Sequence, residues 1–327
     1  MSFKTLLTIL TDPAKVTEIL DSSVRLAARE DAHLDVLSLG IDRTQLGYSY
    51  IGGAAVLAQV SMDRASEDAE KLDAAARTIL NRQDVRWAAE AAVAQLGSVS
   101  SIVATKARFA DLVLLPHPYG KDSAPEAEAV LEAALFEGAA PVLLLPGILL
   151  PETLGKRVVI AWNQGREAMA AVRRALPLLR KADLVNIAVV DPPAYGPERS
   201  DPGGALCQML VRHGVKAEVS VLARTMPRVS DVLVRHVRDQ NADCLVMGAY
   251  GHSRFREAIL GGATRDMLEM AQVPVFLAHW KIGAPGKGRA NRMVQNRLQA
   301  MQRVLTPDSR RRYRRRQLPA AGRNRSR

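Results

Sequence analysis

Residues 247–264 have the sequence MGAYGHSRFREAILGGAT, and this stretch decides the fold of the chain. It follows an apolar segment, 243–247, whose length and composition suit a buried strand. It precedes a segment in which Met267, Leu268 and Ala271 have helical spacing. The glycines therefore lie where a strand is followed by a helix, which is a place where phosphate groups bind.

The same stretch supplies the candidate residues for binding phosphate. Gly248 and Gly251 allow a close approach to the backbone that a Cβ atom would prevent. The helix would begin at 261–264, where free N–H groups and the helix dipole suit an anion and Thr264 adds a hydroxyl. His252 either reaches phosphate or is an exposed loop residue, and a tight turn without a ligand is the alternative for the whole stretch. The candidate residues here are Met247, Gly248, Gly251, His252, Gly261, Gly262, Ala263 and Thr264.

The spacing of these glycines, G-x2-G-x9-G, resembles the nucleotide-binding signature of the universal stress protein family. In that family the last glycine is followed by Ser or Thr, whereas here Gly262 stands at that position. The backbone N–H is kept but a hydroxyl is lost, which costs about 0.5 to 1.5 kcal/mol of phosphate binding if nothing compensates. The resemblance implies that the chain binds ATP or a related adenine nucleotide, with Mg²⁺ as a candidate companion ion.

Apolar and amphipathic segments alternate along residues 3–280, which is typical of a parallel sheet with helices on both faces. Strands are expected at 4–10, 34–39, 85–91, 111–115 and 141–145, and again at 157–162, 184–190, 216–222, 243–247 and 273–278. Helices are expected at 14–30, about 59–81, 99–108, 126–137, 166–179, 205–213, 229–240 and up to 271. The predicted fold class is α/β: two doubly wound five-stranded parallel-sheet domains in tandem, followed by a disordered basic tail.

The two halves also resemble each other in sequence. ADLVLLP at 110–116 corresponds to ADCLVMG at 242–248, and AAPVLLL at 139–145 corresponds to QVPVFLA at 272–278. The chain thus resembles a tandem universal stress protein, whose members pair through the strand that ends the domain. We expect the halves to form an intramolecular pseudo-dimer through 141–145 and 273–278, and a homodimer is a further candidate assembly. The predicted boundaries are 1–148 for the first domain, 149–156 for a linker, 157–282 for the second domain and 283–327 for the tail.

The resemblance also places the adenosine end of the nucleotide. The family has an acidic residue just beyond the first strand of the domain, and Asn163 holds that position here, after Ala161 and Trp162. Asn163 keeps an acceptor oxygen and adds a donor, although the charge is lost. Val189 and Val190, at the end of the next strand, match the family's apolar adenine wall. Trp162 is as consistent with core packing as with contact to the base.

The first half lacks the glycine pattern. PHPYG at 116–120 and EAEAVL at 126–131 stand where the second half has its glycines, so prolines remove backbone donors and glutamates would repel phosphate. We therefore expect the first domain to be a structural partner with a degenerate site. Asp12 is equivalent to Asn163 and is expected to cap a helix, and His117 is expected to be a surface turn residue.

The positive charge of the chain is concentrated at its end. The formal net charge is +11, but residues 283–327 hold 14 Lys and Arg against one acidic residue, which leaves the rest of the chain nearly neutral. Apolar residues at 291–305 have the spacing of a short amphipathic helix, whereas RRRYRRR at 310–316 has nothing to bury and should be disordered. The tail either has no selected partner or binds nucleic acid or another anionic surface weakly and in a salt-sensitive way.

Several other classes of protein are not favoured. Cys207 and Cys244 give neither a disulfide framework nor a zinc spacing, which indicates reduced thiols and a cytoplasmic protein. No apolar stretch reaches the length of a membrane span, and no catalytic triad or dinucleotide fingerprint is placed in a suitable context. The resemblance implies a regulatory or stress-response nucleotide binder rather than a dedicated enzyme, and members of the family sometimes hydrolyse ATP slowly. The competing hypothesis is an interaction or scaffold protein with a decayed nucleotide site, suggested by Asn163 and Gly262.

Overall fold

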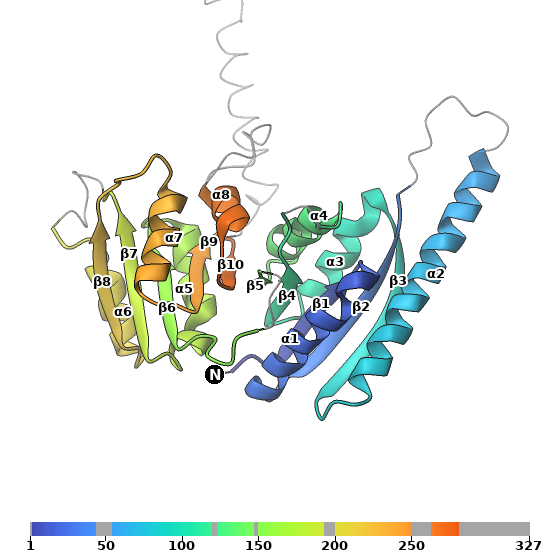
Figure 1. The fold of residues 1–327 in the computed structure, drawn as a ribbon, viewed down its shortest axis with the longest axis horizontal. Coiled ribbons are helices and arrows are strands. Elements are labelled where there is room, and N and C mark those ends of the chain that lie inside the picture. Colours follow the sequence, from blue (N-terminus) through green and yellow to red (C-terminus); the bar gives the residue numbers. More distant parts are fainter. Residues whose placement is uncertain are drawn as a thin grey trace, which may run out of the picture. The chain divides into compact units, whose positions relative to one another are not determined.

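A computed structural model describes residues 2–43, 54–119, 123–146, 150–192, 200–249 and 263–280. The strands within these ranges form one ten-stranded sheet in the order β3-β2-β1-β4-β5-β10-β9-β6-β7-β8 (Figure 1). Helices lie on both faces of this sheet, and the α/β class expected from the alternating pattern is confirmed.

The first half contributes five strands and four helices in the described ranges. Its strands are β1 (Thr5–Leu10), β2 (His33–Asp42), β3 (Arg86–Gln95), β4 (Leu112–Pro116) and β5 (Val142–Leu145). Its helices are α1 (Val16–Glu30), α2 (Ala54–Leu80), α3 (Val99–Ala107) and α4 (Ala127–Glu132). Short 3₁₀ turns at Pro13–Lys15 and Leu96–Ser98 precede α1 and α3, and α4 continues as a π turn over Ala133–Glu137.

The second half repeats this arrangement. Its strands are β6 (Arg157–Ala161), β7 (Leu184–Val190), β8 (Ala217–Leu222), β9 (Cys244–Gly248) and β10 (Val275–Ala278). Its helices are α5 (Arg166–Leu179), α6 (Gly204–Arg212), α7 (Val229–Asp239) and α8 (Ala263–Met270). Within each half all strand pairs are parallel, and the order of the first five strands is mirrored by the second five.

The two sets of strands join through β5 and β10, which pair antiparallel with Phe276 opposite Leu143. Both strands are fully buried, so an apolar edge that would otherwise attract another chain is covered from within. The expected pairing of 141–145 with 273–278 is therefore present. Both strands begin later than expected because Pro141 and Pro274 have no N–H to donate, although each proline carbonyl accepts a backbone bond from the neighbouring strand.

The repeated Ala-Asp dipeptide has a structural cause. Oδ2 of Asp111 accepts hydrogen bonds from the backbone N–H groups of Lys4 (2.7 Å) and Thr5 (3.0 Å), at the start of β1. In the second half the carboxylate of Asp243 accepts from the backbone N–H groups of Gly155 (2.8 Å), Lys156 and Arg157, at the start of β6. Asp111 thus fixes the start of β1 beside β4, and Asp243 fixes the start of β6 beside β9. Burial raises the pKa of Asp243, and the backbone N–H groups oppose that rise.

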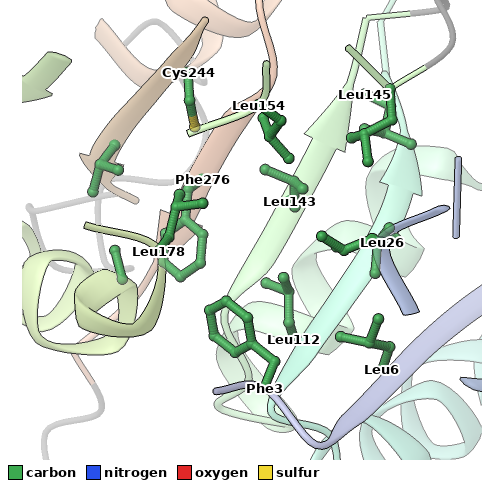
Figure 2. Packing of buried hydrophobic residues seen from close by; sticks show 14 of the residues in the cluster. Phe3, Leu6, Leu26, Leu112, Leu143, Leu145, Leu154, Leu178, Cys244 and Phe276 are labelled. Atoms are coloured by element: carbon green, nitrogen blue, oxygen red, sulfur yellow. The ribbon is translucent and has the colours of Figure 1, made fainter. Parts of the chain in front are cut away.

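Two apolar clusters, one on each face of the sheet, run through both halves. One packs α1, α2, α5 and α6 against the sheet, and the other packs α3, α4, α7 and α8. Figure 2 shows the first cluster where the halves meet, with Leu143 of β5 and Phe276 of β10 among its members. The ring centroids of Phe3 and Phe276 lie 6.4 Å apart, so the residue before β1 and the strand β10 share one core.

A buried carboxylate also connects the halves. The side chain of Glu30, at the end of α1, is 1% exposed and accepts a hydrogen bond from Lys181 Nζ at 2.7 Å. Arg29 contacts Glu30 at 3.5 Å and donates to the carbonyl of Leu154 at 2.6 Å. Because a buried charge without a partner is strongly unfavourable, Lys181 makes the packing of the first half depend on the second.

Candidate functional site

The ends of β6, β7, β9 and β10 meet at one edge of the second half. Ala161, the last residue of β6, pairs with Ala188 of β7 on one side and with Met247 of β9 on the other. Gly248 in turn pairs with Ala278 of β10. The chain passes from β6 to β7 in one direction and returns to β9 in the other, so the order of strands reverses between β6 and β9. In open parallel sheets this reversal point is where ligands bind.

Gly248 is required by packing at this reversal point. A Cβ atom added there would lie 2.5 Å from the backbone nitrogen of Ala168 and 2.6 Å from the carbonyl carbon of Glu167. Both atoms belong to the first turn of α5, so a side chain would push β9 and α5 apart. The group that closely approaches the backbone of Gly248 is therefore the start of α5.

Asn163 lies on the β6 side of the reversal point and is exposed. Its Oδ1 accepts a hydrogen bond from the N–H of Gly165 at 2.9 Å, and its Nδ2 donates to Glu167 Oε1 at 3.0 Å. This local bonding orders the turn into α5 and leaves one N–H and one lone pair of Asn163 for a ligand. Asp12 makes the same contact in the first half, where its Oδ1 accepts from the N–H of Ala14 at 3.0 Å, as expected of a helix cap.

The apolar candidates at the ends of β6 and β7 differ in how far they are buried. Trp162 is 6% exposed and belongs to the first core cluster, and its backbone N–H donates to the carbonyl of Ala188. The structure therefore favours the core interpretation of this tryptophan over base contact. Val189 is also buried, whereas Ala161 and Val190 are half-buried on the opposite face of the sheet and form the apolar surface nearest to the edge.

Ala249 and Thr264, described residues on either side of 250–262, are both buried. Ala249 is buried, and its backbone N–H donates to the carbonyl of Ala278 at 2.9 Å. Met247 and Thr264 are both buried, Thr264 in the first turn of α8. Ala263 begins that helix. The remaining candidates, Gly251, His252, Gly261 and Gly262, lie outside the described residues.

The matching edge of the first half has a different chemistry. Glu126, which precedes α4, is buried and forms a two-point ion pair with Arg43, at 2.8 Å for Nη2 to Oε1 and 3.3 Å for Nε to Oε2. Its charge is therefore balanced by that of Arg43, which the expectation that Glu126 repels phosphate did not take into account. Arg43 lies 83 positions away in the chain, so no local sequence pattern indicates this pairing.

His117 is half-buried, which corrects the expectation of a surface turn residue. Its Nδ1 donates to the carbonyl of Tyr119 at 2.9 Å, while its Nε2 is buried with no partner in the described part of the chain. Burial lowers the pKa of His117. The cavity that it lines with Asp12 and Lys15 has a volume of about 20 Å³, which is room for a water molecule and not for a nucleotide.

The described ranges lack two features that would indicate other functions. No cluster of three or more His, Cys, Asp or Glu side chains there could hold a metal ion. No helix in the same ranges is both long and apolar enough to cross a membrane. Cys244 is fully buried with a raised pKa, and Cys207 is half-buried; both are free thiols.

The sequence model of the universal stress protein family matches residues 155–279, which contain the whole of this edge. The second half of the chain belongs to the universal stress protein family. Universal stress protein Slr1230 from Synechocystis is 34% identical over 73 residues, which are 22% of this chain and 24% of that protein. The match thus spans about a quarter of the length of this curated relative.

Two solved structures of universal stress proteins are similar to this chain over part of its length. The one from Archaeoglobus fulgidus DSM 4304 covers 85% of this chain and 97% of its own, at 17% identity and a TM-score of 0.58. A universal stress protein in complex with cAMP covers 38% of this chain and 96% of its own, at 18% identity and a TM-score of 0.29. The first likeness shows that the universal stress protein fold extends through both halves of this chain.

Proposed function

We propose that the second half binds an adenine nucleotide, ATP or a relative of it, in a regulatory or stress-response role. The observation that carries this proposal is the reversal of strand order between β6 and β9, with Asn163 on one side and Gly248 on the other. The adenine would lie near Ala161 and Val190, where half-buried apolar side chains reach the edge. The phosphates would lie near the start of α8, whose N–H groups and dipole favour an anion.

The chemistry required of this site is binding, not bond breaking. The described edge presents the Asn163 amide, the Glu167 carboxylate that this amide contacts, backbone N–H groups and apolar surface, and we assign it no general base or nucleophile. We therefore infer a binder rather than a dedicated enzyme, in line with the family to which the second half belongs. Mg²⁺ would enter with the nucleotide phosphates.

Calorimetric titration of the full chain with ATP, ADP, AMP and cAMP, each with and without Mg²⁺, tests the proposal. We expect one site per chain. Gly251→Val and Gly261→Val should abolish binding while the thermal unfolding midpoint is retained. Gly97→Val is the matched control, because a Cβ atom at Gly97 would meet no other atom within 4 Å. Absence of binding by the wild-type chain at millimolar nucleotide would refute the proposal.

A second candidate function is that of an interaction protein with a decayed site. The bonding of Asn163 to Gly165 and Glu167 favours it, because the residue is already used in shaping the turn. Thr264 favours it too, because the residue is buried and already has an interaction within the protein. In that case the basic tail, 283–327, would supply the partner contact, and the tail lies outside the described residues.

Binding of RNA and DNA by the full chain and by a chain ending at residue 282, at low and moderate salt, tests this alternative. An electrostatic tail predicts binding that only the full chain shows and that weakens steeply as salt rises. Equal binding by both chains would exclude the tail as the anchor.

A further inference from the structure

The first half contacts the start of α8 through a tyrosine. The guanidinium carbon of Arg265, one residue after Thr264, lies 5.0 Å from the centre of the Tyr119 ring. The Tyr119 hydroxyl donates to Glu128 Oε1 at 3.0 Å, and Arg265 donates to Glu269 Oε1 at 2.9 Å. A cation over an aromatic ring is attracted by the ring's negative face. The first turn of α8 is thus held against the segment that follows β4.

The first half also contacts His279, the residue that follows β10. The Phe136 ring meets the His279 ring edge to face, with centroids 4.7 Å apart and an angle of 87°. Nδ1 of His279 lies 2.9 Å from the carbonyl oxygen of Ala249, which can only accept, so this nitrogen carries the proton. Phe136 therefore packs against the side chain that fixes the Ala249 carbonyl.

These two contacts lie on either side of residues 250–262. Ala249 directly precedes that segment, and α8 directly follows it. Tyr119 and Glu128 belong to 116–120 and 126–131, the two stretches in which the first half departs from the glycine pattern. The sequence departures of the first half thus supply side chains that hold the second half.

We propose that Tyr119, Glu128 and Phe136 are positioning residues for the nucleotide site of the second half. They set the positions of Ala249 and of the start of α8 without touching the nucleotide. A ligand that needs those positions must by linkage also strengthen the contact between the halves. This inference rests on the proposed function, because the nucleotide phosphates are the group that the start of α8 would meet.

The test compares two aromatic rings of the first half, each of which lies under an arginine, in the full-length protein. Tyr119→Leu removes the ring under Arg265 and should weaken ATP binding about threefold to fivefold. Tyr119→Phe keeps the ring and should restore most of the affinity. Trp87→Leu is the matched control, because Arg77 lies over the Trp87 ring at 5.9 Å on β3, far from α8 in the strand order. It should leave the nucleotide affinity unchanged even if stability falls.

A double-mutant cycle and hydrogen exchange complete the design. Arg265→Gln combined with Tyr119→Leu should weaken binding no more than either change alone. Exchange at the α8 amides should be faster in Tyr119→Leu than in Trp87→Leu, and this readout does not require a ligand. If the wild-type chain binds no nucleotide, the proposed function fails. The exchange data would still test whether Tyr119 holds the start of α8. Equal affinity and equal α8 exchange in Tyr119→Leu and Trp87→Leu would overturn the inference.

Discussion

Replacing Gly248 by alanine measures how tightly β9 and α5 are packed where the strand order reverses. The new Cβ atom would lie 2.5 Å from the Ala168 backbone nitrogen and 2.6 Å from the Glu167 carbonyl carbon. Ordinary contacts between such atoms lie between 3.4 and 4 Å, so the strand end or the helix start must move by about 1 Å. Overpacking of this kind costs about 1 to 3 kcal/mol, and because both contacts are backbone atoms we expect the upper part of that range.

Urea unfolding of the full-length protein gives the magnitude, with Gly97→Ala as the control. The control position has no atom within 4 Å of a new Cβ, so its free energy of unfolding should be unchanged or higher by about 0.4 to 1 kcal/mol. Gly248→Ala should lower that free energy and also weaken nucleotide binding, because the displaced atoms adjoin Asn163. Equal unfolding midpoints for the two variants would refute the packing argument.

Four further outcomes are expected. Asn163→Ala should lower the free energy of unfolding by about 1 kcal/mol in urea titrations, because the Gly165 N–H loses its acceptor. Lys181→Met should be destabilising by about 1 to 3 kcal/mol in the same assay, because Glu30 would lose its short contact and keep only the longer one to Arg29. Burial lowers the pKa of His236 from its ordinary 6.5, so the unfolded chain takes up a proton at a higher pH than the folded chain does. The free energy of unfolding should therefore fall as the pH drops below about 6.5. His236→Gln should make this dependence of the free energy of unfolding on pH less steep. Residues 1–150 expressed alone should dimerise or aggregate through β5, and a stable monomer in sedimentation would contradict this.

Sequence patterns predicted the elements best where apolar spacing was regular. The expected bounds of α5 and β7 agree with the structure, because their apolar residues follow the helical and strand periods throughout. β3 extends to Gln95, four residues beyond the expected end, because it pairs with β2 over its whole length although its outward residues are only partly buried. Such pairing depends on a neighbouring strand and leaves little trace in the local sequence.

The candidate site was harder to predict residue by residue. The glycine spacing pointed to the edge of the sheet where the strand order reverses, but the need for glycine at 248 comes from Glu167 and Ala168 of α5, far away in the sequence. The pairing of Glu126 with Arg43 was invisible for the same reason. Trp162 shows the limit of a strand pattern, because the pattern says that a side chain is near a strand end and not which neighbours cover it.

The antiparallel pairing of β5 with β10 determines how the sheet responds when the protein is diluted. Two separate chains joined by the same strands would dissociate as their concentration fell, because association between molecules obeys mass action. Here both strands belong to one chain, so each is held at a high effective concentration near the other. The unfolding midpoint should therefore be independent of protein concentration, and a cell containing a few copies would keep the ten-stranded sheet as intact as one containing thousands.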